Sequence, residues 1–401
     1  MNKKVRINSL KIKAFIQLIK ERHERFSTAI VKAIIKEYPV NTLARKLHPA
    51  KQYVKISKVD DNGQDCKTFT LTADAERGTT NLAYFSSGQY ITVFLEINGQ
   101  KVTRAYSLSS APYESLGANG YYQITVKAAN EGLVSNYILN TWKAGDKIEI
   151  AAPEGNFDYV SLRDAPVVVG IAGGSGITPF LSFAKSIAKG DENFKLILLY
   201  GSRDSKSILF KKEFDELQKL SDKITVVHVL SNEEAEGFEH GFITADLIRK
   251  YAPQNPYSVF LCGPQAMYNF MDKELEKLSL EKKYIRHEMF GEIHSAKTQE
   301  GYPGCSKEMV NITVTICDET ATVKGSSDDT ILQILEKNGI AVPNRCRSGE
   351  CGWCHTLVKS GTYWLPKKMD FRRKADSKYN YIHPCCTFPL SDMELDVPPA
   401  K

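Results

Sequence analysis

The stretch RCRSGECGWC, residues 345–354, contains three cysteines in a C-x4-C-x2-C spacing, at Cys346, Cys351 and Cys354. A fourth thiol follows in the segment HPCCTFP, as either Cys385 or Cys386. Three cysteines within nine residues, followed by a distant fourth, form a set of metal ligands. The loop therefore predicts a metal centre near the C-terminus, and the last domain should be built around it.

Two kinds of metal centre compete for this loop. Structural zinc sites combine C-x2-4-C pairs, whereas the spacing found here is that of a [2Fe-2S] cluster. Gly349 and Gly352 also favour the cluster, because they allow a tight loop with positive φ whose backbone N–H groups hydrogen-bond the cluster sulfurs. A two-iron cluster carries one electron at a time, so the rest of the chain should contain the electron source.

Length and composition describe a globular protein of two or three domains. The chain has 401 residues, of which 42% are hydrophobic and 25% are charged. Nine cysteines, five of them after residue 340, do not suit a disulfide framework and indicate thiol ligation in a reducing compartment. No run of about 18 apolar residues is present, and the N-terminal patch FIQLI is too short for a signal peptide. We therefore expect a cytoplasmic protein.

Residues 1–49 are predicted to form a basic amphipathic helical extension, as one helix or two. The first 50 residues contain twelve lysine and arginine residues against three glutamates, and the whole chain has a formal net charge of +6. Apolar residues recur there at helical spacing: Ile12, Phe15, Ile16 and Ile19, and then Phe26, Ile30, Ile34 and Ile35. The extension could pack on the protein's own body, dock to a partner or lie on anionic lipid, which is the least favoured alternative. Nucleic-acid binding would rest on this arm alone and is not expected.

The periodicity of the remaining chain indicates three domains. Residues 50–158 contain five or six short alternating strands separated by turn residues, which predicts an antiparallel β-barrel. In residues 159–290, short apolar runs alternate with amphipathic helices, as in a doubly wound parallel α/β sheet. Residues 291–308 are polar and contain glycine, which is typical of a linker. Residues 309–401 contain a strand pair, a short helix, the cysteine loop and a final strand.

The first binding motif is RAYSLSSAP, which begins at Arg104 at the end of a predicted barrel strand, and GLVSNYI follows at residues 132–138. The guanidinium of Arg104 offers bidentate hydrogen bonds to a pyrophosphate. The helix that begins near Ser135 offers free N–H groups and a positive dipole. Tyr106 is placed to lie against a flat ring. An ordinary surface strand with one arginine is the alternative interpretation.

The second motif is GIAGGSGITPF, residues 170–180, between a buried strand and a helix. Its glycines allow the backbone to approach a diphosphate closely, and the start of the helix then binds it. The segments YGSR, residues 200–203, and FLCGP, residues 260–264, come at the ends of later strands. Each therefore lies at the edge of an open parallel sheet where ligands bind.

Together these motifs resemble those of the ferredoxin–NAD(P)+ reductase superfamily, in the order found in members that end in a plant-type [2Fe-2S] ferredoxin domain. R-x-Y-S with a downstream G-x-x-S, and PEGNF at residues 153–157, are similar to the flavin-binding barrel of that family. The resemblance implies that a flavin is held by Arg104, Tyr106, Ser107 and Ser135. It places Val126 and Lys127 on the next flavin-facing strand.

The same resemblance implies the residues of the nucleotide site, which are Gly173, Gly174, Gly176, Thr178, Ser202, Arg203, Cys262 and Gly263. Cys262 would lie beside the nicotinamide, so the expected catalytic side chains are Cys262, Tyr106 and Ser107. Glu288 and Phe290 resemble the family segment that closes over the flavin. Near this site two cations, Arg203 and Lys206, face the single carboxylate of Asp204. This charge balance slightly favours NADPH, with NADH as the alternative.

The cysteine loop resembles that of plant-type ferredoxins, which implies a β-grasp domain in residues 309–401. The implied cluster ligands are Cys346, Cys351, Cys354 and Cys385. The family has its fourth cysteine four residues before a proline, here Pro389, so Cys386 would be a neighbour. His383 and Pro384 depart from the family pattern before that cysteine. His355 would be a ligand only in a Rieske-type site, which needs two histidines in another spacing.

The resemblance implies an NAD(P)H-dependent oxidoreductase that passes electrons from NAD(P)H through a flavin to the [2Fe-2S] cluster, and singly to a partner redox protein. FAD is the expected flavin, with FMN as the alternative. The partner would be an oxygenase or another reductase. Two other functions are compatible with the domain order: a self-sufficient NAD(P)H oxidase or flavin reductase, and a tethered electron carrier without catalysis. A tethered carrier without catalysis would have degenerate nucleotide motifs, whereas GGSGITP and FLCGP are intact.

Overall fold

The computed structural model describes residues 13–25, 38–63, 65–129, 132–291, 293, 295–367 and 374–398. The chain divides into two units, Met1–Pro49 and Ala50–Lys401. In the first unit, residues 13–25 are helical and α2 spans Pro39–Leu47. The predicted apolar repeat of residues 26–35 lies outside the described residues. Among the residues described, none of the helices combines the length and apolar character that crossing a membrane requires.

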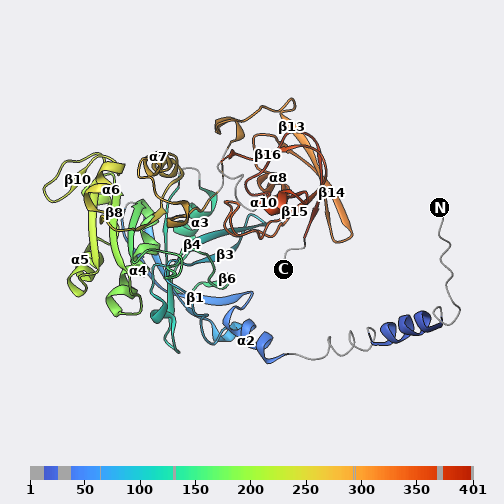
Figure 1. Ribbon diagram of the computed structural model, residues 1–401, viewed down its shortest axis with the longest axis horizontal. Helices are drawn as coiled ribbons and strands as arrows, with labels where there is room; N and C mark the ends of the chain where they lie inside the picture. The colour runs from blue at the N-terminus through green and yellow to red at the C-terminus, as the bar shows by residue number, and fades with distance from the viewer. Residues whose placement is uncertain are drawn as a thin grey trace, which may run out of the picture. The chain divides into compact units, whose positions relative to one another are not determined.

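The second unit begins with a six-stranded antiparallel sheet that bends into a half-barrel (Figure 1). Its strands are β1 (Gln52–Asp61), β2 (Cys66–Ala73), β3 (Tyr90–Ile97), β4 (Gln100–Ser107), β5 (Tyr121–Lys127) and β6 (Lys147–Ile150). Their order is β4-β3-β6-β1-β2-β5, and a bridge between Leu108 and Ile124 brings the two edge strands together. Alternate side chains such as Val54 and Ile56 fill the interior because strand residues alternate between faces. The helix α3 (Leu133–Thr141) follows β5.

The second sheet is parallel throughout, with the order β10-β9-β8-β7-β11-β12. Its strands are β7 (Val167–Gly173), β8 (Lys195–Ser202), β9 (Ile224–Leu230), β10 (Glu239–His240), β11 (Ser258–Cys262) and β12 (Ile285–Glu288). The helices α4 (Thr178–Lys189), α5 (Lys211–Leu220), α6 (Ala245–Tyr251) and α7 (Gln265–Glu276) connect them. The apolar runs predicted as strands form the centre of this sheet. The edge strand β12 was not predicted, because IRHE is too polar to read as a buried strand.

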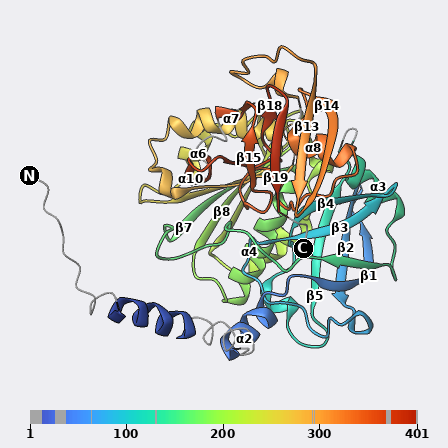
Figure 2. The same ribbon diagram turned by 90° about the vertical axis from the view of Figure 1, so that its right-hand side faces the viewer.

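The third sheet carries the cysteine loop and has the order β14-β13-β19-β15-β17 (Figure 2). Its strands are β13 (Met309–Ile316), β14 (Glu319–Ser326), β15 (Thr356–Ser360), β17 (Tyr381–Ile382) and β19 (Met393–Val397). A separate two-stranded antiparallel sheet pairs β16 (Tyr363–Trp364) with β18 (Phe388–Pro389), and α10 covers Lys374–Ser377. The helix α8 (Ile331–Lys337) begins with a capping box, in which Thr330 Oγ1 accepts from Gln333 N and Gln333 Oε1 accepts from Thr330 N. The predicted multidomain fold of antiparallel β-barrel, doubly wound sheet and ferredoxin-type domain is confirmed, and the barrel takes the form of a half-barrel sheet.

Contacts between the three domains of the second unit are specific. The hydroxyl groups of Ser87 and Ser186 lie 2.7 Å apart, and Lys185 forms an ion pair of 3.1 Å with Glu114, so the half-barrel is joined to α4. Ile293 and Ala296 belong to a core shared by the parallel sheet and the ferredoxin-type domain. The segment that is polar by composition therefore carries two buried anchors between these domains.

Candidate functional site

All three domains of the second unit contribute to one cavity of about 930 Å³. Its walls come from the ends of β4 and β5, from the carboxyl edge of the parallel sheet and from the cysteine loop. The predicted residues that line it are Arg104, Tyr106, Ser107, Lys127, Gly173, Gly174, Gly176, Thr178, Ser202, Arg203, Cys262, Gly263, Glu288, Phe290 and Cys346. Most of the residues predicted from separate motifs thus meet at one site.

The half-barrel side of the cavity contains a buried hydroxyl–carboxyl pair. Ser107, the last residue of β4, donates from Oγ to Glu288 Oε2 at 3.3 Å. Burial raises the pKa of the Glu288 carboxyl well above its usual range, and the nearby charge of Glu350 adds to the rise. Glu288 ends β12, which places it beside Cys262, the last residue of the neighbouring strand β11.

Arg104 and Ser135 differ in their relation to the cavity. Arg104 lines it and also donates from Nη1 to the carbonyl oxygen of Thr103 at 2.7 Å. Ser135 does not line it, because its hydroxyl accepts from the amide of Ala129 at 3.3 Å near the start of α3. Val126 is buried in the core of the half-barrel, whereas Lys127 reaches the cavity.

The glycine-rich segment forms a tight turn between β7 and α4. Residues Gly174–Ile177 make a single 3-10 turn, and α4 begins directly at Thr178. A Cβ atom on Gly176 would lie 2.2 Å from the carbonyl oxygen of Cys262, so only glycine lets this turn approach β11 so closely. Gly174, Gly176 and Thr178 of this turn line the cavity, so its backbone lies where a diphosphate could approach it closely.

Cys262 is held as a neutral thiol by its surroundings. Burial raises the pKa of its thiol well above the ordinary value, and the charge of Glu288 raises it further. Tyr268 of α7 supports this corner, because its hydroxyl accepts from Gly263 N at 3.1 Å and donates to the carbonyl oxygen of Glu288. The sequence did not identify Tyr268, since an aromatic residue in an amphipathic helix is ordinarily a core residue.

Arg203 and an aromatic pair line the cavity near the end of β8, and a second cation, Lys206, lies close by in the sequence. Lys206 belongs to the adjoining 3-10 turn. The carboxylate of Asp204 caps that turn, with Oδ1 accepting from Ser207 N at 2.9 Å. The aromatic pair is Phe242 and Phe270, with ring centroids 5.7 Å apart. The Asp204 side chain is therefore engaged within its own turn.

The four cysteines predicted as ligands lie as two pairs in the ferredoxin-type domain. Cys346 Sγ accepts from the backbone N–H groups of Cys351 at 3.3 Å and Ser348 at 3.4 Å. A hydrogen bond from the Cys351 thiol lowers the pKa of Cys346 well below its ordinary value. The Sγ atoms of Cys354 and Cys385 lie 3.4 Å apart. Two pairs of thiols with N–H groups aimed at a sulfur fit a two-iron cluster, in which each iron takes two protein ligands.

The loop glycines have the predicted backbone conformation, with φ of 79° at Gly349 and 78° at Gly352. A Cβ atom on Gly349 would lie 2.7 Å from Cys386 Sγ, so the second thiol of the Cys385–Cys386 pair packs beneath the loop. In the described parts of the chain, no three or more His, Cys, Asp or Glu side chains form a group suited to a single metal ion. The thiol arrangement is that of paired ligands.

Two histidines border the cysteines. His355 stacks on Tyr381, with ring centroids 4.6 Å apart and an interplanar angle of 14°. His383 Nδ1 lies 4.0 Å from Cys354 Sγ, and His383 Nε2 lies 3.0 Å from Asp376 Oδ2. Burial lowers the pKa of His383, but the hydrogen bonds with Cys354 and Asp376 outweigh burial and raise it overall. The unusual His-Pro before Cys385 was the sequence signal for this contact.

Comparison with protein families identifies each domain of the second unit. Residues 53–159 match the model of the oxidoreductase FAD-binding domain, residues 171–273 that of the oxidoreductase NAD-binding domain, and residues 314–390 that of the 2Fe-2S iron-sulfur cluster binding domain. The chain therefore binds FAD, NAD(P)H and a [2Fe-2S] cluster, and the observed cavity and paired thiols fit these groups.

Individual relatives match this chain over most of their length. The glycine betaine monooxygenase reductase subunit of Pseudomonas aeruginosa (strain UCBPP-PA14) is 25% identical over 86% of this chain and 94% of its own. The ferredoxin reductase component of 3-ketosteroid-9-alpha-monooxygenase from Rhodococcus rhodochrous is 29% identical over 77% and 86%. In fold, phthalate dioxygenase reductase superposes with a TM-score of 0.61 at 24% identity, covering 87% of this chain and 98% of that one.

The three domain matches, the domain order and the shared cavity lead to one assignment. The enzyme is an NAD(P)H-dependent oxidoreductase that carries electrons through FAD and a [2Fe-2S] cluster to a partner. The chain belongs to the ferredoxin–NAD(P)+ reductase superfamily, in the group whose flavin and nicotinamide domains are followed by a C-terminal [2Fe-2S] ferredoxin domain.

Proposed function

We propose that this protein is the reductase component of an oxygenase system, which it supplies with single electrons drawn from NAD(P)H. The supporting observation is the shared cavity, in which the nucleotide turn, the flavin strand and the cluster-loop residue Cys346 are neighbours. The names of the relatives support an oxygenase as the partner, because two of them are reductase parts of monooxygenases.

The chemistry itself comes from the bound groups: the flavin accepts a hydride from NAD(P)H and gives up electrons singly, and the cluster carries them one at a time. The protein binds and orients these groups. Arg104 and the turn at Gly174–Ile177 offer hydrogen bonds to the two diphosphates. Tyr106 and Cys262 line the cavity, where Tyr106 would pack beside the flavin ring and Cys262 would lie at the nicotinamide as a small neutral group. The ligands of the cluster are Cys346, Cys351, Cys354 and Cys385.

Ser107 and Glu288 have a further role in this proposal. Their hydrogen bond of 3.3 Å is buried at the edge of the cavity. Burial raises the pKa of the Glu288 carboxyl and so favours its protonated form. The pair can therefore keep Ser107 Oγ in place beside a bound flavin.

At the adenosine end we assign Arg203 and Lys206 to the ribose and its phosphate. Because Asp204 is engaged in capping its own turn, its carboxylate is not directed at a ribose hydroxyl. This arrangement supports acceptance of NADPH. The alternative, discrimination in favour of NADH, would require a carboxylate free to accept from that hydroxyl.

The purified holoenzyme tests the proposal directly. NAD(P)H oxidation is measured with ferricyanide as a small acceptor, with cytochrome c as a protein acceptor and with oxygen. We expect fast reduction of both added acceptors and slow reduction of oxygen. Oxidation of NAD(P)H by oxygen at the rate found with cytochrome c would contradict a partnered reductase and favour a self-sufficient oxidase.

A further inference from the structure

A group of three side chains joins the cluster loop to the half-barrel. Glu154, in the PEGNF segment after β6, accepts through Oε2 from Arg345 Nη1 at 2.5 Å and from Trp353 Nε1 at 3.1 Å. Arg345 directly precedes Cys346, and Trp353 directly precedes Cys354. One carboxylate oxygen therefore binds the cluster loop at two points, each adjacent to a ligand cysteine. We call Glu154, Arg345 and Trp353 the Glu154 latch.

The ion pair of the latch is largely removed from solvent, whereas Trp353 is 40% exposed. The Arg345 guanidinium lies over the indole ring of Trp353, 3.6 Å from its centroid. The side chains of Arg345 and Glu154 are only 10% and 21% exposed. Burial raises the pKa of Glu154, although Arg345 opposes the rise. Exposed ion pairs contribute little, whereas removing one partner of a desolvated pair leaves a charge uncompensated. This contact should therefore hold the two domains together firmly.

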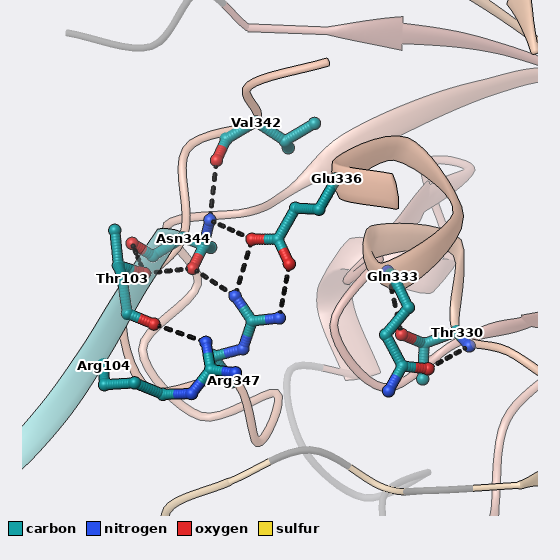
Figure 3. Close-up of polar contacts among 8 residues, drawn as sticks. All are labelled: Thr103, Arg104, Thr330, Gln333, Glu336, Val342, Asn344 and Arg347. Carbon is teal, nitrogen blue, oxygen red and sulfur yellow. Dashed lines mark hydrogen bonds and ion pairs between the residues drawn. The ribbon is translucent and has the colours of Figure 1, made fainter. Parts of the chain in front are cut away.

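A second contact fixes the same end of the loop to the flavin strand (Figure 3). Thr103 of β4 donates from Oγ1 to Asn344 Oδ1, which also accepts from Arg347 Nη1 at 3.1 Å. Arg347 in turn forms a bidentate pair with Glu336 of α8, at 2.7 and 2.6 Å. Residues 344–347 are thus tied to β4 on one side and to the ferredoxin helix on the other.

These contacts bracket Cys346, which lines the cavity together with Tyr106. We propose that the Glu154 latch is a positioning element that holds the cluster loop at the flavin cavity, so that electrons reach the cluster at full rate. This inference rests on the proposed function, because it concerns the step in which an electron leaves the flavin reduced by NAD(P)H and enters the oxidised cluster. Small displacements of reacting groups by about 1 Å can cost roughly 100-fold in rate.

Stopped-flow measurements on the anaerobic holoenzyme separate the two steps. NAD(P)H is mixed with wild type, Glu154→Ala and Arg345→Ala, and bleaching of the flavin and reduction of the cluster are followed. Flavin bleaching should stay within about twofold of wild type, while cluster reduction should slow at least about tenfold in each variant. The double variant should be no slower than either single one, since both remove the same contact. Asp396→Asn is the matched control, because it also removes a carboxylate from an ion pair with a cation, but its pair with Lys359 is exposed and lies within the ferredoxin-type domain.

A second readout does not depend on turnover. Amide hydrogen exchange of residues 344–354 should rise in Glu154→Ala, and the midpoint potential of its cluster should match wild type. Glu154→Gln keeps the size of the side chain and one acceptor oxygen, so cluster reduction should slow less than in Glu154→Ala. If the alanine variant binds less iron than wild type, the rate is measured on the glutamine variant instead. Cluster reduction at the wild-type rate in both Glu154→Ala and Arg345→Ala would overturn the latch. A wild-type flavin that NAD(P)H does not bleach would instead overturn the proposed function.

Discussion

The sulfur atoms of Cys354 and Cys385 lie 3.4 Å apart, although 31 positions separate them in the chain. The neighbouring thiol of Cys386 packs beneath Gly349, where an added Cβ would lie 2.7 Å from it. The two adjacent cysteines therefore occupy different places, one beside a ligand and one under the loop. This geometry supports Cys385 as the fourth ligand and gives each thiol a separate test.

We expect Cys385→Ser to lose the cluster and Cys386→Ser to keep it, because a serine hydroxyl is a poor ligand for iron. Iron and sulfide content, with the visible spectrum, measure the outcome. Cys385→Ser should retain ferricyanide reduction through the flavin. The opposite result, in which Cys386→Ser lacks the absorption bands of the cluster and Cys385→Ser keeps them, would show that Cys386 is the ligand.

Gly176→Ala should weaken the nucleotide site. The added Cβ would lie 2.2 Å from the Cys262 carbonyl oxygen, so the turn must move away from β11. We expect kcat/KM for NAD(P)H to fall at least about tenfold while flavin content is unchanged. The control is Gly190→Ala at the end of α4, where φ is 89° and nothing lies within 4 Å. It should cost only about 1 kcal/mol of stability, and equal losses of kcat/KM in both variants would contradict this account.

Arg203→Ala should raise KM for NADPH at least about tenfold and KM for NADH less than about threefold, because the guanidinium is assigned to the extra phosphate. Steady-state kinetics with the two nucleotides and ferricyanide measure the difference. Asp204→Asn tests the capping role of that carboxylate. If the preference for NADPH over NADH rises in Asp204→Asn by a larger factor than it falls in Arg203→Ala, the carboxylate acts on the bound nucleotide.

The pH dependence of stability should contain a contribution from His228 of β9. Burial lowers the pKa of this imidazole to about 4, and neither ring nitrogen has a hydrogen-bond partner among the described residues. In the unfolded chain the imidazole of His228 takes up a proton below about pH 6.5, whereas in the folded protein it stays neutral until the pH approaches 4. The contribution is therefore fully present above pH 6.5 and is lost as pH falls towards 4, by about 3 kcal/mol in all.

Urea unfolding of wild type and His228→Phe between pH 7.5 and 4.5 measures this contribution as the difference between the two proteins. Phenylalanine suits the site, because the imidazole packs between the rings of Tyr200 and Phe238. The variant should lose less stability on acidification. Parallel curves for the two proteins would show that His228 is protonated in the folded state.

Removal of residues 1–48 should leave ferricyanide reduction unchanged, because no predicted cofactor residue lies there. If the extension docks to a partner, reduction of the oxygenase slows; if it binds lipid, the full chain but not the truncated one sediments with anionic vesicles. Lower stability without either effect would identify the extension as a helix that packs on the protein itself.

Much of the site was predictable because its groups belong to short local motifs. GGSGITPF, YGSR and FLCGP each combine a strand end with residues of a turn, and the rule that ligands bind at the carboxyl edge of a parallel sheet joins them. The positive φ of Gly349 and Gly352 was likewise predictable from the tight cysteine spacing. Local chemistry was less informative for Ser135, whose hydroxyl bonds Ala129 instead of lining the cavity, and for the polar edge strand β12.

The sequence by itself determined the fold class, the order of the domains and the cofactors, because these depend on periodicity and on motifs of a few adjacent residues. Only the tertiary structure decided which domain surfaces meet and which side chains join them. Glu154 belongs to one local motif and Arg345 and Trp353 to another, but neither motif predicts that they meet, and the residues of the Thr103–Asn344 contact are 241 positions apart. Such pairs form only when packing brings distant segments into register, and desolvation then turns ordinary charged and polar residues into a specific contact.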